Sequence, residues 1–227
     1  MTAIKDAVAA LPAGALTESA VAMHVRPLFA RVLEAAGDTV YLANHSLGRP
    51  LDATAADVQE GLAAWYAQMG GAWDPWAAEM AAWRQRLATL TGAPRADCIV
   101  PKASAGQGLR AVLNALDGVP RVVATRGEFD SLDVILREYA RRGRIALTLV
   151  DANADGEFET AAILRAIGAG AELVVVSQVI FNTGQRLADL PSIVAASHAA
   201  GARIMVDVYH EFDHPFEMTA ADRKSVV

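Results

Sequence analysis

The segment Arg203-Ile204-Met205-Val206-Asp207-Val208-Tyr209-His210 decides how the chain is organised. Its apolar run predicts a buried strand over residues 204–208, which carries Asp207 near its end and is followed by His210. Four other short apolar runs predict strands, and helical patterns separate most of them. These strands are expected at residues 98–101, 121–125, 145–150 and 173–177. Continuous apolar strands joined by helices indicate an α/β fold: a three-layer sandwich with a mostly parallel sheet covered on both faces.

The connections between the strands and the first third of the chain carry helical periodicity. Helices are expected at residues 17–36, 54–69, 74–90, 109–116, 132–139, 161–167 and 190–200. Thr54-x-x-Asp57 resembles a capping box, and Asp74-Pro75 suits the N-cap and first position of a helix. We therefore expect an N-terminal helical segment over residues 1–95, followed by a sheet domain over residues 96–219.

Composition limits the class of protein. The chain has 227 residues, of which 53% are hydrophobic and 20% charged, enough for a sizeable buried core. A net charge of −6 argues against a nucleic-acid surface. The single cysteine, Cys98, permits no intrachain disulfide and fits a reducing compartment. The sequence has no signal-peptide pattern and no apolar stretch of roughly 18 residues, so we expect a cytoplasmic protein that does not span a membrane.

Asp207 falls at the carboxyl end of a buried strand, where ligands bind in parallel sheets. A carboxylate against a pyridinium nitrogen keeps that nitrogen protonated, so that the ring withdraws electrons from a substrate carbanion. His210 is close enough in sequence to orient Asp207 or to contact the same ring. The plain alternative is an aspartate that caps the following turn. A metal site built from Asp207, His210, Asp213 and His214 matches no motif of fixed geometry, and no metal is predicted.

The segment Ala103-Ser104-Ala105-Gly106-Gln107-Gly108 follows an expected strand and opens a helix. Small residues allow close backbone approach, and the N–H groups at a helix N-terminus favour a phosphate. Gly106-x-Gly108-x-x-Ala111 also fits the dinucleotide fingerprint, with Glu128 placed 20 residues beyond Gly108. An NAD(P)-dependent oxidoreductase is therefore the rival hypothesis. The remaining alternative is that these small residues only begin a helix and bind no ligand.

Two further strand ends carry candidate ligands. Phe129 follows the strand at residues 121–125, where an aromatic ring can cover one face of a flat cofactor; the alternative is a core phenylalanine at the start of the next helix. Ser177 begins a polar loop that contains Thr183-Gly184-Gln185, and such loops at strand ends are where sites are built.

These segments, in this order, resemble the kynureninase branch of the class V aminotransferases, which are fold-type-I pyridoxal-phosphate (PLP) enzymes. Residues 41–48 resemble that family's Y-x-x-N-S-L-G segment, here with His45 inserted, and Asp207-x-x-His210 its D-x-x-H motif. Ser177 with Thr183-Gly184-Gln185 resembles its S-G-x-x-x-x-T-G-Q loop. The resemblance implies the N-terminal part of a PLP-binding large domain, in a homodimer that acts on a small amino-acid substrate. It implies that the cofactor is bound by Ala103, Ser104, Phe129, Asp130, Ser177, Asp207 and His210.

The chain also departs from this family's pattern. Leu132 stands where the family has an aspartate, so either Asp130 or Asp133 is expected to replace it. The S-Y-K segment with the Schiff-base lysine is missing, and Lys224 is the only lysine after Asp207. We therefore expect an inactive fragment that stops before the catalytic lysine, with residues 220–227 as a non-native tail.

The resemblance leaves several functions open for the parent protein. Kynureninase-like enzymes hydrolyse a Cβ–Cγ bond, whereas class V relatives run transamination, desulfuration or epimerisation in the same pocket. The oxidoreductase hypothesis and a non-catalytic partial domain are the remaining alternatives. The pyridoxal hypothesis requires Asp207 near Ser104 and Phe129. The oxidoreductase hypothesis requires Glu128 at the end of the second strand, with the first helix under the pyrophosphate.

Overall fold

A computed structural model describes residues 2–44, 46–210, 225 and 226. The chain divides into two compact units, Met1–Ala82 and Trp83–Val227. The domain boundary expected after residue 95 remains a prediction. None of the helices in the described part of the chain is long and apolar enough to cross a membrane.

The first unit begins with short helices, α1 (Thr2–Ala9), α2 (Glu18–Ala20) and α3 (Ala30–Ala36). The continuous helix expected over residues 17–36 is wrong. A π-helical turn and a 3-10 turn separate α2 from α3, over Val21–Val25 and Arg26–Phe29. Pro27 lies in this break, and a proline cannot donate the N–H bond that a continuous α-helix requires.

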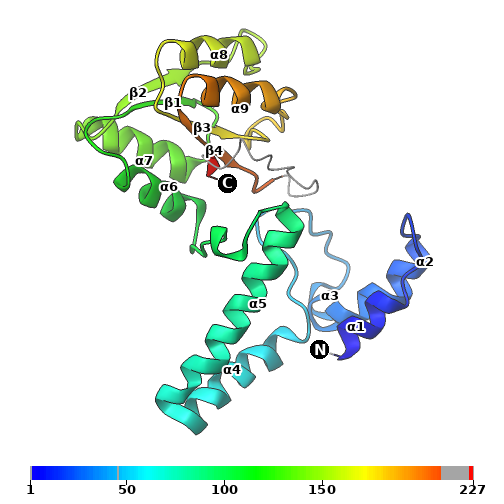
Figure 1. Ribbon diagram of the computed structural model, residues 1–227. Helices are drawn as coiled ribbons and strands as arrows, with labels where there is room; N and C mark the ends of the chain where they lie inside the picture. The colour runs from blue at the N-terminus through cyan, green and yellow to red at the C-terminus, as the bar shows by residue number, and fades with distance from the viewer. Residues whose placement is uncertain (1, 45, 211–224, 227) are drawn as a thin grey trace. The chain divides into compact units, whose positions relative to one another are not determined.

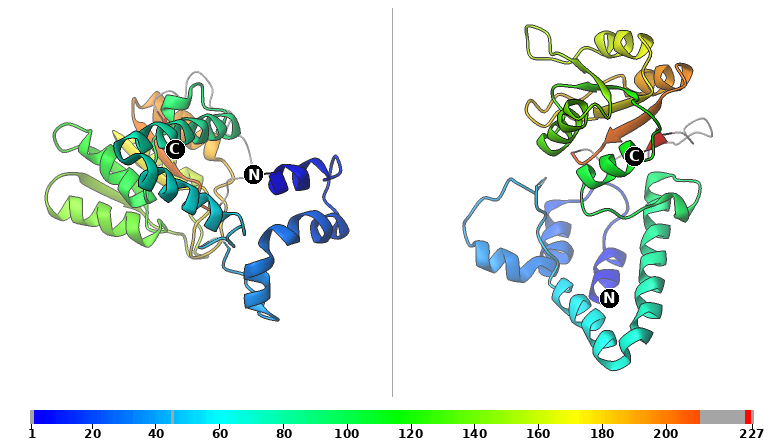
Figure 2. Two further views of the ribbon diagram at one scale, coloured as in Figure 1. Left: turned by 90° about the horizontal axis from the view of Figure 1, so that it is seen from below. Right: turned by 90° about the vertical axis from the view of Figure 1, so that its left-hand side faces the viewer.

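A helical hairpin follows, formed by α4 (Thr54–Gln68) and α5 (Trp73–Thr91) and joined at Met69–Ala72 (Figure 2). Both expected helices are confirmed, but their expected caps are wrong. Ala53 is the N-cap of α4 and makes no side-chain bond, so Thr54 is already helical. Asp74 lies inside the first turn of α5, because that helix begins at Trp73.

The second unit contains a parallel sheet with the strand order β2-β1-β3-β4-β5. The strands are β1 (Arg121–Thr125), β2 (Ala146–Val150), β3 (Leu173–Ser177), β4 (Arg203–Asp207) and β5 (Ser225–Val226). Four of them confirm expected strands, whereas β5 falls in residues 220–227, whose non-native origin remains a prediction. The strand expected at residues 98–101 is wrong: Ala96–Cys98 form a 3-10 turn, and Pro101 has no N–H to donate to a ladder.

Helices cover both faces of this sheet (Figure 1). On one face lie α6 (Ala105–Asn114) and α7 (Asp130–Arg141), and on the other α8 (Thr160–Gly168) and α9 (Leu190–Ala199). Side chains alternate along β3, so Leu173 and Val175 pack toward α6 and α7, whereas Val174 and Val176 pack toward α8 and α9. The expected α/β three-layer sandwich is thus confirmed.

The register of β3 and β4 determines which side chains meet at the edge of the sheet. Ser177 pairs with Asp207 at the carboxyl ends of the two strands. Val175 and Met205, two residues earlier, both pack in the core cluster that contains α6 and α7. Because side chains two residues apart share a face, Ser177 and Asp207 point to the same side of the sheet, toward the layer of α6 and α7.

Candidate cofactor site

Asp207 is partly buried at the carboxyl end of β4. Its Oδ1 accepts a hydrogen bond from the Tyr209 N–H at 2.9 Å, and its carbonyl oxygen accepts one from the Gln178 N–H, also at 2.9 Å. Asp207 therefore does cap the next turn, as the plain alternative proposed. Within the described part of the chain no donor reaches its other carboxylate oxygen, Oδ2, which leaves that atom available to a protonated ligand.

Glu128 lies beside Asp207 and was not identified as part of this site from sequence. Its side chain is only 3% exposed and accepts two hydrogen bonds, from the Thr125 hydroxyl at 2.5 Å and from the Ser177 hydroxyl at 2.7 Å. Burial raises the pKa of Glu128 to about 7; the two hydroxyl donors oppose this shift, and the charge of Asp207 adds to it. The sequence had indicated Glu128 only as the acidic residue of the dinucleotide alternative, three residues after the end of β1.

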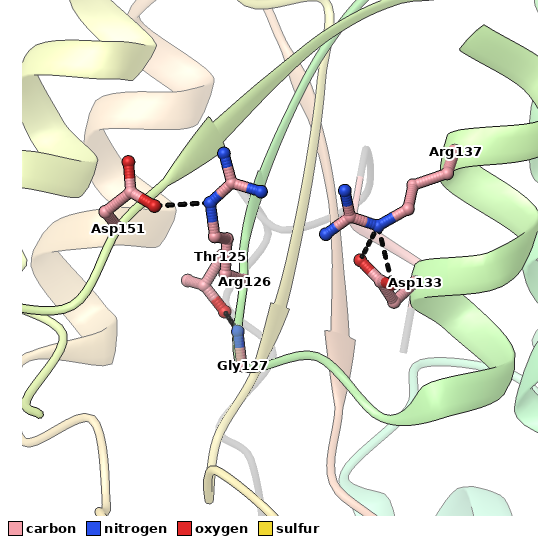
Figure 3. A network of polar contacts seen from close by, with 6 residues as sticks. All are labelled: Thr125, Arg126, Gly127, Asp133, Arg137 and Asp151. Carbon is pink, nitrogen blue, oxygen red and sulfur yellow. Dashed lines mark hydrogen bonds and ion pairs between the residues drawn. The ribbon is translucent and has the colours of Figure 1, made fainter. Parts of the chain in front are cut away.

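The turn that carries Glu128 has no space for a larger residue at Gly127. A Cβ at this position would lie 2.6 Å from a ring carbon of Phe158 and 2.9 Å from a methyl group of Ile180. The Gly127 N–H donates to the Thr125 hydroxyl oxygen at 3.2 Å, and Arg126 forms an ion pair with Asp151 beside it (Figure 3). Packing and hydrogen bonds together fix the direction in which the chain leaves β1.

Phe129 follows in the same turn and precedes α7. It is 40% exposed, so it is not the core phenylalanine of the plain alternative. Its ring meets Phe181 edge to face at 5.1 Å, and Phe181 lies nearly parallel to His210 with ring centroids 6.4 Å apart. Phe129, Phe181 and His210 therefore form an aromatic cluster at the strand ends. Phe181 was not identified from sequence.

The N-terminus of α6 lies next to that of α7. A Cβ on Gly106 would be 3.0 Å from the Ile135 side chain and 3.5 Å from the Ser131 hydroxyl, so the two helix starts are in close contact. Ser104 is the N-cap of α6, since its hydroxyl oxygen accepts a bond from the Gln107 N–H at 3.2 Å. The first backbone N–H groups of a helix lack intrahelical partners, which makes this end suitable for an anion.

Gln107 already bonds the Ala103 N–H and the Ser104 hydroxyl oxygen within this cap, whereas the Ser104 hydroxyl keeps its proton to donate. The Ala103 N–H donates to the Gln107 side-chain oxygen at 2.8 Å, and Ser104 bonds the Gln107 N–H. The structure thus places both residues at the α6 N-terminus, where a bound phosphate would compete with Gln107 for the Ala103 N–H. Their direct contact with the cofactor remains a prediction.

The two candidates for the missing family aspartate lie in the first turn of α7. Asp133 holds the Arg137 Nε with both oxygens, at 2.8 Å and 2.7 Å (Figure 3), whereas Asp130 is exposed at the first helical position. Leu132 is fully buried in the core beneath them. An arginine partner makes Asp133 the less available of the two carboxylates.

The residues at this edge fit a PLP molecule. Asp207 offers for the ring nitrogen a carboxylate oxygen that no described residue bonds, the start of α6 offers N–H groups for the phosphate, and Phe129 offers an exposed ring face. These are the three parts of the cofactor that need recognition. Of the proposed metal ligands, Asp213 and His214 lie outside the described residues.

The dinucleotide alternative does not fit this geometry. No strand precedes the Gly106-x-Gly108 loop, and Gly106 serves the contact between α6 and α7. Glu128 is buried beneath two hydroxyl donors and is not available to a ribose.

The Tyr41–Gly48 segment belongs to the first unit, and a hydrogen bond joins its two ends. The Tyr41 hydroxyl donates to the Leu47 carbonyl at 2.7 Å, and the Arg49 guanidinium lies 5.3 Å from the centre of the Tyr41 ring. Arg49 also donates to the Asn44 side chain at 3.2 Å. His45, which interrupts the expected motif, lies outside the described residues.

Comparison with solved structures shows the same fold in PLP enzymes. Cysteine desulfurase CsdA from Escherichia coli superposes with a TM-score of 0.68 at 21% identity, over 87% of this chain and 51% of that one. A C-DES mutant with glycine covalently linked to its PLP cofactor gives 0.72 at 19% identity, over 85% and 52%. The apo cysteine desulfurase from Thermococcus onnurineus gives 0.62 at 18%, over 80% and 46%. The chain thus spans about half the length of these proteins.

Sequence comparison gives the family. None of the curated proteins matches the chain. The family model for class-V aminotransferases matches residues 52–220, which contain the whole sheet edge with Asp207, Ser177 and Phe129. The chain therefore belongs to the class-V aminotransferases, a family of fold-type-I enzymes whose cofactor is PLP.

Proposed function

We propose that this chain is the cofactor-binding part of a PLP-dependent enzyme that acts on an amino acid in a kynureninase-like reaction. The observation that carries the proposal is the position of Asp207. Its carboxylate lies at a strand end, on the side of the sheet that faces α6 and α7, and no donor among the described residues bonds its Oδ2. An ionised carboxylate here would hold a proton on the ring nitrogen of the cofactor.

The other residues have binding roles in this proposal. Backbone N–H groups at the start of α6, with Ser104, bind the phosphate, and Phe129 covers one face of the ring. Asp130 is the free carboxylate of the first α7 turn, and His210 extends the aromatic cluster beside Asp207. When bound, PLP withdraws electrons from bonds at the substrate α carbon. The amine that would hold PLP covalently lies outside these 227 residues in our proposal, so the chain alone is inactive.

The aromatic cluster favours kynureninase-like hydrolysis of a Cβ–Cγ bond over the other class V reactions. Phe181 is 40% exposed, and it touches Phe129 on one side and His210 on the other. An exposed ring beside the cofactor face suits a substrate whose leaving group is itself aromatic, because ring pairs stabilise beyond their buried area. The side chain of cysteine has no ring to pair with this surface. Desulfuration of cysteine is the second candidate, because a cysteine desulfurase shares the fold.

Titration of the purified chain with PLP by calorimetry tests the cofactor site. We expect non-covalent binding in the wild-type chain and at least about tenfold weaker binding in Asp207→Asn, since a hydrogen bond to a charged group contributes about 1.5–3 kcal/mol. Asp155→Asn is the matched control, because Asp155 is an exposed aspartate in the turn after β2. Equal affinities for the Asp207→Asn and Asp155→Asn variants would show that the assignment of Asp207 is wrong.

The substrate class is tested with stable phosphopyridoxyl conjugates, which need no lysine. We expect the kynurenine conjugate to bind more tightly than the alanine and cysteine conjugates, and Phe181→Ala to remove this preference. A preference for the cysteine conjugate would support the desulfurase candidate instead. We further propose a cytoplasmic homodimer; light scattering of the purified chain measures its oligomeric state.

A further inference from the structure

We infer that Glu128 is a positioning residue: it takes the hydroxyl proton of Ser177 and thereby leaves the Asp207 carboxylate free for the cofactor ring nitrogen. This inference rests on the proposed function, and it assigns to Glu128 a role distinct from direct contact with the cofactor.

Ser177 would otherwise be expected to bond Asp207. The two residues are direct partners in the β3–β4 register and point to the same side of the sheet. A serine hydroxyl has a single proton to donate. In this structure that proton goes to Glu128 Oε2 at 2.7 Å, and Ser177 is only 4% exposed, so water does not compete for it.

Glu128 is itself held in place from both sides. Its second oxygen accepts the Thr125 hydroxyl at 2.5 Å, and the Gly127 N–H donates to the same hydroxyl oxygen at 3.2 Å. The preceding Gly127 packs against Phe158, where an added Cβ would lie 2.6 Å from a ring carbon, and this close packing restricts the turn. A carboxyl group in the turn after β1 is thus anchored where it can reach across to the last residue of β3.

The consequence concerns the basicity of Asp207. A hydrogen bond donated to a carboxylate stabilises its charged form and makes it a weaker base. Asp207 already accepts the Tyr209 N–H at Oδ1. A further bond from Ser177 would reduce its ability to hold a proton on a bound ring nitrogen, and Glu128 prevents that bond.

The experiment is run above the Glu128 pKa of about 7, where this side chain is ionised and accepts at both oxygens. It removes first the acceptor, Glu128, and then the donor, the Ser177 hydroxyl. Glu128→Leu retains the bulk of the side chain and offers no acceptor, so the Ser177 hydroxyl turns to Asp207. We expect the 15N signal of labelled PLP bound to this variant to move from the protonated toward the unprotonated pyridine position, with roughly tenfold weaker binding, the change equivalent to one pKa unit. Adding Ser177→Ala to Glu128→Leu should bring the signal to that of Ser177→Ala alone, because neither protein then has a hydroxyl at position 177 that could donate to Asp207.

The outcomes separate this inference from the proposed function. If the wild-type chain binds no PLP, the proposed function fails and the inference fails with it. If the wild-type chain binds PLP with a protonated ring nitrogen, but Glu128→Leu gives no shift or its shift survives Ser177→Ala, the inference alone is wrong. Should Glu128→Leu not fold, Glu128→Met, which also offers no carboxylate acceptor, decides: a shift of the 15N signal supports the inference, and an unchanged signal overturns it. A loss of stability alone would lower the melting temperature without moving the 15N signal of bound PLP.

Discussion

The side-chain amide of Gln185 makes two hydrogen bonds with the main chain of Phe158. It accepts from the Phe158 N–H at 2.8 Å and donates to the Phe158 carbonyl at 2.9 Å, although the two residues are 27 apart in sequence. Phe158 in turn lies against Gly127, directly before Glu128 and Phe129. Gln185 thus fixes the main chain of Phe158, and the Phe158 ring packs against the Gly127 turn of the proposed cofactor site.

Replacing Gln185 by glutamate should therefore destabilise the protein. A carboxylate cannot donate to the Phe158 carbonyl and would place a charge against it, and an unsatisfied buried group costs about 1–3 kcal/mol. Urea denaturation should show a loss of this size. Gln85→Glu is the matched control, since Gln85 is exposed on α5, and it should change the free energy of unfolding by less than about 0.5 kcal/mol. Equal effects of both substitutions would contradict this role for Gln185.

Two glycines of the second unit should respond to alanine in opposite directions. Gly127→Ala forces a Cβ to 2.6 Å from the Phe158 ring, and overpacking of this kind costs about 1–3 kcal/mol. Gly108 lies inside α6, and a Cβ added there would meet nothing within 4 Å, so Gly108→Ala should stabilise the helix by up to about 1 kcal/mol. In thermal melts, the melting temperature of Gly127→Ala should therefore lie below that of the wild type and that of Gly108→Ala above it. A neutral Gly127→Ala would mean that the turn can relax.

The stability of the chain should depend on pH through Glu128. Its pKa is raised from 4.5 to about 7 in the folded state, so the folded chain keeps this proton over a range in which the unfolded chain has lost it. The stabilisation is fully present below about pH 4.5 and is lost as the pH rises through about 7. Relative to Glu128→Gln, which cannot ionise, the wild type should lose on the order of 3 kcal/mol across this window. Urea denaturation at several pH values measures the difference; parallel curves for the two proteins would show that Glu128 does not titrate there.

No lysine of this chain should form a stable covalent link with PLP. Lys102 is exposed and precedes the α6 N-cap, and Lys5 lies in α1; the third lysine, Lys224, is outside the described residues. Borohydride treatment of the chain with PLP, followed by peptide mass spectrometry, should find only low-level modification spread over all three. Selective, stoichiometric modification of Lys102 or Lys224 would overturn the proposal that the catalytic amine lies outside these residues.

Much of the sheet could be predicted from sequence because its signals are local. The apolar runs predict β1 and β3 with the bounds that the structure has, and β2 and β4 to within one residue at each end. The runs also place Asp207 and Ser177 at strand ends. The prediction failed where a local signal was ambiguous. Residues 98–101 are apolar enough for a strand, but they pair with no strand among the described residues. Pro27 divides a helix whose hydrophobic periodicity is otherwise continuous.

The sequence by itself determined the alternation of strands and helices and the strand ends at which ligands would bind, since hydrophobic periodicity depends only on near neighbours. The contacts that make the site depend on which strands become neighbours. Glu128 and Ser177 are 49 residues apart, and they meet because β3 pairs with β1 on one side and β4 on the other. Strand order and register are set by the packing of the whole sheet, so only the tertiary structure decided that the buried Glu128, not Asp207, receives the Ser177 hydroxyl.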